Sequence, residues 1–179
     1  MADRQVERET GKRSHRHNTQ SSIKRFETKL KDEYTEQWQN ENKIQHKLLC
    51  YQSLNRDIQL AEYLKTKNPK EIRILTKYRV SDHELEIERG RHLKVWRPRE
   101  ERVCTHCHQD IKTELHFLCT CPKYEGLRTK YFQKFEKHIP GFTTYTEDKK
   151  LPFLLGEDKN TAWLAAKYVF SCHNTRNNK

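Results

Sequence analysis

The stretch "ERVCTHCHQDIKTELHFLCTCPKY" (residues 101–124) holds four of the six cysteines and three of the ten histidines of this 179-residue chain. Cys104 and Cys107 are separated by two residues, a spacing at which two thiolates converge on one ion from a tight turn. His116 and Cys121 complete the pattern C-x2-C-x8-H-x4-C. A structural zinc ion takes four such ligands at tetrahedral corners. We therefore predict a Zn²⁺ site formed by these four side chains.

Cys119 is the alternative fourth ligand, because it follows His116 by three residues and shares its face if the segment is helical. Pro122 directly follows Cys121 and predicts that any helix ends there. This ending favours Cys121, with Cys119 as its substitute. Two more histidines lie within reach of the turn, His106 and His108.

Disulfides and catalysis are the rival explanations of the cluster. The first twenty residues lack the apolar core of a secretory signal, so we expect an intracellular protein, nuclear or cytoplasmic, whose clustered cysteines bind metal. A catalytic zinc needs an open position and a general base. Glu114 lies near His116, but three cysteines and a histidine favour a filled structural site. No other cysteine has an evident base, and we predict that the chain is not an enzyme.

The composition points to a small core and an anionic partner. Only 33% of the residues are hydrophobic and 34% are charged, so a core of this size benefits from a metal as an additional link. The formal net charge of +11 favours RNA or DNA, because lysine and arginine that neutralise phosphates release condensed counterions. No apolar run approaches the roughly 20 residues that cross a bilayer, so no membrane partner is expected.

The chain reads as mainly α, with four parts. We predict a disordered basic arm over residues 1–22, N-terminal helices over 23–66, a helical zinc-binding domain over 67–140 and a C-terminal helical extension, 141–179, packed on the same domain. A stripe of apolar residues at three- and four-residue steps predicts an amphipathic helix whose stripe belongs to the core: Ile23, Phe26, Leu30, Tyr34 and Trp38.

Capping signals place two further helices. In the first of these helices, Asn68 is suited to the N-cap and Pro69 to the first helical position. Ser81 and Glu84 have the spacing of a capping box for the next, and Gly90 is suited to end it. A hairpin around "ERGR" is the alternative, because hydrophobic residues alternate on either side.

Several stretches together resemble a known family. "IRILTKYRVSDHELEIERGRH", "PREERVC", "CTHC", "ELHFLCTCPKYEGLR" and "AAKYVF" occur in this order. They resemble the C-terminal segment of the second reading frame of animal non-LTR (LINE-type) retrotransposons, which carries the reverse-transcriptase-associated zinc-binding domain. The resemblance covers residues 60–127 well. It implies the same four zinc ligands and a module that helps the element's reverse-transcriptase ribonucleoprotein hold RNA or target DNA.

The polymerase itself is not expected in this chain, because it contains no Asp-Asp pair of the kind that holds two catalytic metals. We predict phosphate contacts from basic residues on the helices and the connector that lead into the zinc site. Trp96 is a candidate for stacking on an unpaired base. The alternative is a structural or protein-interaction module in which zinc only completes the core. The predicted contacts are Lys77, Arg79, Arg89, Arg91, Arg97, Arg99, Arg102, Lys123, Arg128 and Lys130.

Overall fold

The computed structural model describes the backbone of residues 3–45, 49–54, 58–92, 94 and 96–178. Side chains are described from Gln20 onward, except that of Leu49. The chain divides after Gln45 into two units, residues 1–45 and 46–179, so the division falls inside the predicted segment 23–66. None of the described helices is long and apolar enough to cross a membrane.

The first unit is built on one helix, α1 (Asp3–Ile44). We predicted a disordered arm over residues 1–22, whereas the structure continues the helix back to Asp3. The physical reason lies in the composition, because this segment contains many Glu, Arg, Lys and Gln residues, which have high helix propensity, and no proline. High helix propensity in this segment therefore continues α1 back to Asp3.

The apolar stripe of α1 is exposed. Phe26 is 67% exposed, and Ile23, Leu30 and Tyr34 are more than half exposed. In the described part of the first unit, taken by itself, these side chains therefore form no core. A stripe at helical spacing is buried only where a second element covers it.

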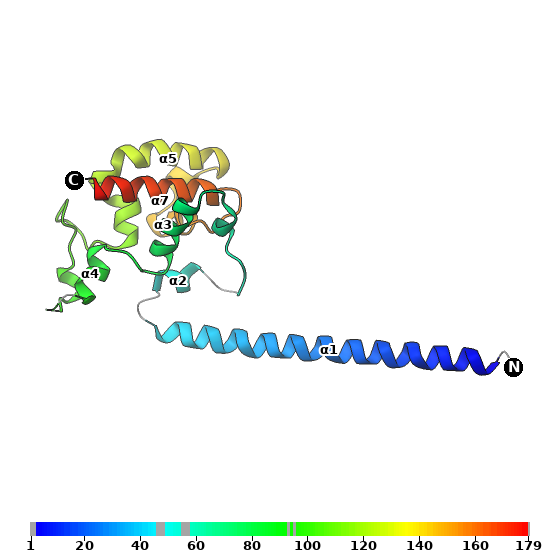
Figure 1. The fold of residues 1–179 in the computed structure, drawn as a ribbon. Coiled ribbons are helices and arrows are strands. Elements are labelled where there is room, and N and C mark those ends of the chain that lie inside the picture. Colours follow the sequence, from blue (N-terminus) through cyan, green and yellow to red (C-terminus); the bar gives the residue numbers. More distant parts are fainter. Residues whose placement is uncertain (1–2, 46–48, 55–57, 93, 95, 179) are drawn as a thin grey trace. The chain divides into compact units, whose positions relative to one another are not determined.

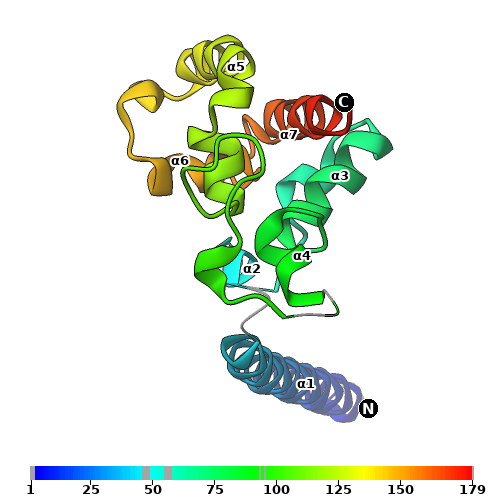
Figure 2. The ribbon, with the colours of Figure 1, turned by 90° about the vertical axis from the view of Figure 1, so that its left-hand side faces the viewer.

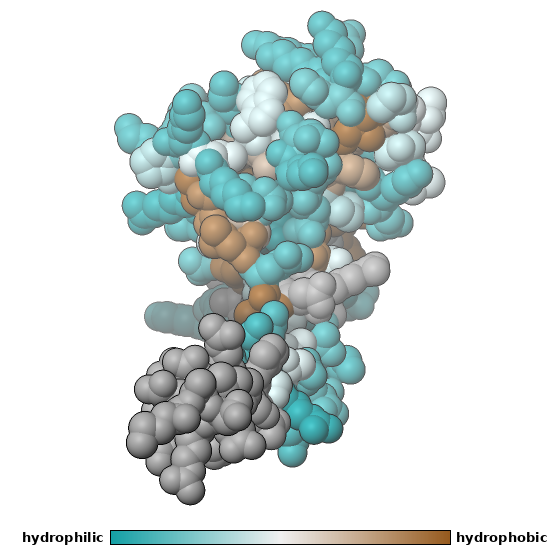
Figure 3. Space-filling model, turned by 90° about the vertical axis from the view of Figure 1, so that its right-hand side faces the viewer, coloured by the Kyte–Doolittle hydropathy of each residue, from teal (hydrophilic) through white to brown (hydrophobic). Residues whose placement is uncertain are grey.

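The second unit is a cluster of helices around α7 (Figures 1 and 2). Its helix α7 (Ala162–Asn177) packs against α3, α5 and α6 and buries seven of its sixteen residues, which explains the high apolar content of its sequence. The surface in Figure 3 is mostly hydrophilic, as the charged composition requires. The predicted mainly helical fold is confirmed. The other α-helices are α2 (Leu49–Leu54), α3 (Pro69–Arg79), α4 (Glu86–His92), α5 (Glu125–His138) and α6 (Glu147–Leu154).

Helix α3 begins as its sequence predicts. The side chain of Asn68 accepts a hydrogen bond from the backbone N–H of Lys70 at 3.0 Å, and Pro69 occupies the first helical position. Leu75 and Tyr78 face the interior and are fully buried. The N-cap therefore fixes where α3 begins, and α3 packs against α7.

The next helix forms, but not with the predicted cap. Ser81 has a φ of 53° and lies outside α4, which begins only at Glu86, and its hydroxyl donates to the carboxylate of Glu114. Gly90 lies inside α4 rather than after it. A Cβ at Gly90 would lie 2.7 Å from side-chain atoms of Arg102, so glycine is needed there for close packing.

Aromatic rings connect α3 to the cysteine-rich segment. The ring of Phe117 stacks on that of Tyr78 with centroids 5.0 Å apart, and Tyr124 contacts Phe117 edge-on at 4.8 Å. All three side chains are buried. The segment that carries His116 and Cys121 is therefore anchored in the helical core by its own aromatic neighbours.

Candidate metal centre

Cys104 and Cys107 lie on a tight turn between two short extended segments. Val103 and Ile111 form an antiparallel bridge that brings the ends of this turn together. Within the turn, the backbone N–H of His108 donates to the carbonyl of Cys104 at 2.9 Å, and the left-handed φ of His108, 54°, reverses the chain. The turn holds both sulfurs on one side, as the two-residue spacing predicts.

The second pair of side chains is presented by a π-helical turn, η4 (His116–Thr120). The N–H of Cys121 donates to the carbonyl of His116 at 2.8 Å, five residues earlier. The wider turn frees backbone carbonyls that would accept hydrogen bonds within an α-helix. The buried hydroxyl of Tyr168 on α7 donates to one of them, the backbone carbonyl of Leu118. π-Helical turns of this kind occur frequently at functional sites.

The structure brings the four predicted ligands together. One ligand atom from each of Cys104, Cys107, His116 and Cys121 lies within 4.8 Å of all the others. The sulfurs of Cys104 and Cys121 are 3.8 Å apart, and the sulfur of Cys107 is 3.3 Å from Nε2 of His116. Tetrahedral zinc with Zn–S bonds of about 2.3 Å requires sulfurs about 3.8 Å apart. These two separations are compatible with tetrahedral coordination, and the group could hold a metal.

The imidazole of His116 is oriented by its other nitrogen. Nδ1 lies 2.9 Å from the hydroxyl of Thr120 and 3.5 Å from the carboxylate of Asp110, which leaves Nε2 to face the sulfurs. Metal-binding histidines are commonly held in this way by a polar group on the second nitrogen. Burial lowers the pKa of His116, so the ring is neutral near pH 7, as a ligand must be. Sequence reasoning missed Asp110 and Thr120, although Thr120 follows His116 by one helical turn.

The electrostatics around Cys104 favour a thiolate. Burial opposes its ionisation, but backbone N–H groups of Cys107 and His106 and the charge of Lys112 lower its pKa below the usual value. The Lys112 side chain is only 2% exposed and carries the cation that most directly affects Cys104. Burial and the neighbouring Cys104 raise the pKa of Cys121 to about 11 without a metal.

Cys119 points away from the cluster. Its sulfur lies 3.9 Å from the backbone carbonyl of Glu147 at the start of α6, and burial raises its pKa to about 12. Among the described residues, Cys119 is therefore not part of the four-residue group. The π turn explains the difference, because it rotates Cys121 into the cluster while Cys119 faces the helical core.

Glu114, the candidate base for a catalytic zinc, has other contacts. Its carboxylate accepts hydrogen bonds from the hydroxyl of Ser81 and from Nε2 of His83, each at 3.0 Å. Burial alone would raise its pKa, but these donors hold it below the usual value. The carboxylate therefore ties the segment after α3 to the start of η4.

Three of the predicted phosphate contacts are buried and structural, which corrects their assignment. Arg79 is 1% exposed and donates to the carbonyl of Leu155 and the carboxylate of Glu157. Arg102 donates to the backbone carbonyls of Ile87 and Arg97, with its chain packed on Gly90. These guanidinium groups satisfy buried acceptors and are not available to phosphates.

Arg128 is the third, and it supports the metal centre directly. It donates to the carbonyl of Cys121 at 2.6 Å and to the carboxylate of Glu125. A signal for its burial exists in the sequence, because Arg128 shares a helical face with Phe132 and Phe135. Arg79 likewise follows Ile72 and Leu75 in helical register. A cation on the apolar stripe of a helix indicates an internal partner.

The remaining predicted contacts lie nearer the surface. Arg89 and Arg97 pair with Glu86, and Arg91 pairs with Glu88. The ammonium of Lys123 lies 3.3 Å from Nε2 of His106. Three others stay at least partly exposed: Lys77, Arg99 and Lys130.

No family model, curated protein or solved structure matches this chain.

Proposed function

We propose that this chain is a zinc-binding, nucleic-acid-binding module, derived from the C-terminal part of a LINE-type reverse transcriptase and lacking its polymerase and endonuclease sites. The observation that carries the proposal is the convergence of three sulfurs and one imidazole nitrogen within 4.8 Å. The resemblance of residues 60–127 to the zinc-binding domain of these elements supports it.

Zinc is the metal that best suits this ligand set. Thiolates and imidazole select zinc among the common divalent ions, and a site with three cysteines and one histidine is characteristic of structural zinc. Four protein ligands would fill its coordination shell. Bound zinc would supply a crosslink between the turn at Cys104 and the η4 segment, and its binding energy would contribute to folding.

Nucleic-acid binding is supported by charge. The chain carries 36 Lys and Arg residues against 25 Asp and Glu. The half-buried Lys77 and the exposed Arg99 and Lys130 remain candidate phosphate contacts after the three buried arginines are excluded. Side chains of this kind contact phosphates and confer affinity without sequence preference.

The test measures metal content and nucleic-acid binding on one sample. Purified full-length chain, with and without chelator, is analysed for zinc and titrated with RNA and duplex DNA at several salt concentrations. If about five phosphates are neutralised, the log–log slope of affinity against salt is about −4 to −5. Absence of zinc would refute the metal assignment, and binding without salt dependence would refute the phosphate contacts.

A structural or protein-interaction module is the second candidate function. Burial of Arg79, Arg102 and Arg128 favours it, because part of the apparent excess of cations serves internal carbonyls. Under this alternative, zinc removal lowers the melting temperature, but the chain binds neither RNA nor DNA at physiological salt. Both candidate functions predict the same loss of melting temperature when a chelator removes zinc. Titration with nucleic acid therefore decides between them.

A further inference from the structure

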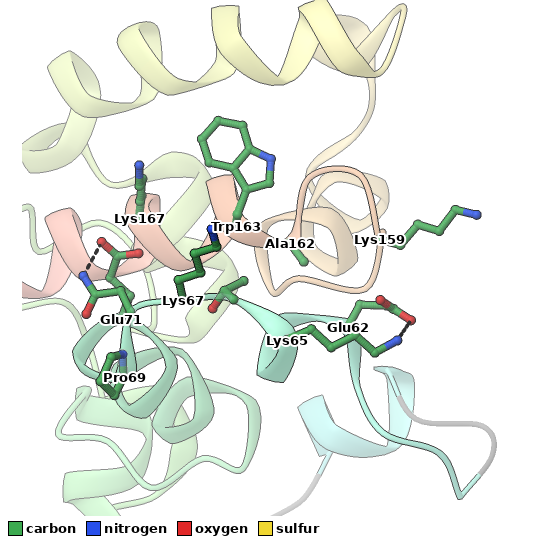
Figure 4. Close-up of a pocket in the computed structure, with 11 residues that line it drawn as sticks. Glu62, Lys65, Lys67, Pro69, Glu71, Lys159, Ala162, Trp163 and Lys167 are labelled. Atoms are coloured by element: carbon green, nitrogen blue, oxygen red, sulfur yellow. Dashed lines mark hydrogen bonds and ion pairs between the residues drawn. The ribbon is translucent and has the colours of Figure 1, made fainter.

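A groove lies where two helices of the second unit begin, apart from the metal ligands. It has a volume of about 810 Å³ and runs between the segment leading into α3 and the start of α7 (Figure 4). This volume falls within the usual range of ligand sites. The lining residues are Glu62, Lys65, Thr66, Lys67, Asn68, Pro69, Glu71, Lys159, Ala162, Trp163 and Lys167.

Trp163 is an exposed aromatic residue with a fixed orientation. It is 43% exposed, although the residues on either side of it in α7, Ala162 and Leu164, are buried. Its indole N–H donates to the carbonyl of Asn160 at 3.1 Å, and the ring of His138 meets it edge-on with centroids 6.1 Å apart. These contacts fix the orientation of the ring. A large aromatic surface is thus ordered in advance on the solvent side of α7.

Cations accompany this ring. The ammonium of Lys167, one helical turn further along α7, lies 5.2 Å from the centre of the Trp163 ring. Figure 4 shows the ammonium of Lys67 directed toward Trp163, while Lys159 extends outward from the groove. Within the described part of the chain, none of these three lysines forms an ion pair.

The acidic residues of the groove are occupied. Glu62 pairs with Lys65 at 2.7 Å, and the side-chain amide of Asn68 donates to Glu71 at 2.9 Å. Glu71 keeps its negative charge, but the groove holds four lysines against two glutamates, so its net charge is positive. An occupant must supply both a flat π surface and negative charge.

We propose that this groove binds single-stranded nucleic acid, with an unpaired base stacked on Trp163 and its phosphates contacted by Lys67 and Lys167. Stacking platforms flanked by cations are the usual means of holding single strands. A duplex keeps its bases stacked internally and cannot offer one to the indole. The inference rests on the proposed function and adds the strand state and the place of contact.

Trp163 provides its own spectroscopic probe. Replacing Trp38 and Trp96 by phenylalanine leaves Trp163 as the only tryptophan. Addition of an oligothymidine of about ten nucleotides, a length that covers one typical site, should quench its fluorescence saturably. Quenching should weaken as salt is raised. A duplex of the same length should quench it much less.

Substitutions then separate stacking from charge. Trp163→Ala should lower affinity for the oligothymidine at least tenfold, and Trp163→Phe should restore most of it. Lys67→Ala with Lys167→Ala should lower the affinity and make the salt slope shallower by about 1 to 2. The matched control is Phe26→Ala, which removes an aromatic ring that is 67% exposed and does not line the groove, and it should change affinity less than twofold.

The outcomes distinguish this inference from the function on which it rests. Zinc content and melting temperature of each variant establish that the fold is intact. If Trp163→Ala binds the single strand normally while duplex binding stays salt-dependent, the groove inference is overturned and the proposed function stands. Equal quenching by polyglutamate would also overturn it, since the groove would then recognise charge alone. If neither single strand nor duplex binds, both proposals fail.

Discussion

Two sets of cysteines in this protein differ in environment although their residue type is the same. Cys104, Cys107 and Cys121 converge with His116. Cys119 and Cys172 are buried in the helical core, where burial raises the pKa of each to about 12. Cys119 and Cys121 are only two residues apart. The comparison teaches that the backbone turn, rather than local cysteine density, selects the thiols available to a metal.

The largest effect is expected from replacing each of these two cysteines by alanine in turn. Cys121→Ala removes one of four ligands, so bound zinc should fall well below about one ion per chain and cooperative melting should be lost. Cys119→Ala should retain zinc and lower the free energy of unfolding by about 1 kcal/mol. Metal analysis after dialysis and thermal melting measure both. Loss of zinc in Cys119→Ala alone would contradict the assignment of Cys121, rather than Cys119, as a ligand.

A smaller effect is expected at the support of the π turn. Arg128→Met leaves the buried carbonyl of Cys121 without its donor, which should lower the free energy of unfolding by about 2–3 kcal/mol and weaken zinc binding. Lys130→Met, two residues along α5 and exposed, is the control and should change stability by less than about 0.5 kcal/mol. Urea titrations of both variants measure the difference. Similar losses in the two would contradict a supporting role for Arg128.

The charge balance of the metal site gives the next prediction. Three thiolates and one neutral histidine leave a zinc site with one net negative charge, which the buried Lys112 can offset. Lys112→Met should weaken zinc about tenfold, measured by competition with a chromogenic chelator. Lys123→Met removes a cation directly after Pro122 and should have little effect. Equal affinities for zinc in the two variants would show that Lys112 does not stabilise the thiolates.

The smallest effect at neutral pH concerns the core thiol of Cys172. Burial raises its pKa from 9.0 to about 12. The folded state therefore keeps a proton that the unfolded chain releases, so the contribution to stability is complete below pH 9 and is lost as the pH rises toward 12. Between these two pKa values, the contribution of this thiol to the free energy of unfolding falls by about 1.4 kcal/mol for each pH unit. Urea midpoints between pH 8 and 10 should fall less steeply in Cys172→Ala than in the unmodified chain; parallel curves would contradict this.

Much of the site was accessible from local sequence. The pair Cys104 and Cys107 depends only on a two-residue turn, and Pro122 indicated where the second ligand segment ends. The cap of α3 at Asn68 is likewise a local interaction, and it was predicted correctly. Ser81 shows the limit of such reasoning, because its hydroxyl bonds Glu114, a partner 33 residues away, instead of capping the next helix.

The buried Arg79 shows that local sequence also fails to specify the distant partners of a charged side chain. Arg79 contacts backbone and side-chain acceptors more than seventy residues away, at Leu155 and Glu157. No local pattern specifies those acceptors, although the helical register of Arg79 indicated an internal position. The lysines around Trp163 were missed for a related reason, since Lys67 and Lys167 are a hundred residues apart and line one groove only because α3 and α7 pack together.

By itself, the amino-acid sequence determined the helical class, the first cap of α3 and the four residues suited to a metal, because each depends on propensity or on spacing within a few residues. Only the tertiary structure decided that Cys121 rather than Cys119 joins the cluster, that Arg79, Arg102 and Arg128 serve the interior, and that Trp163 lines a basic groove. The burial of Arg79 and the groove at Trp163 depend on partners far apart in the chain, whose positions are set by packing around α7, whereas Cys121 depends on the π turn and Arg128 on acceptors within seven residues.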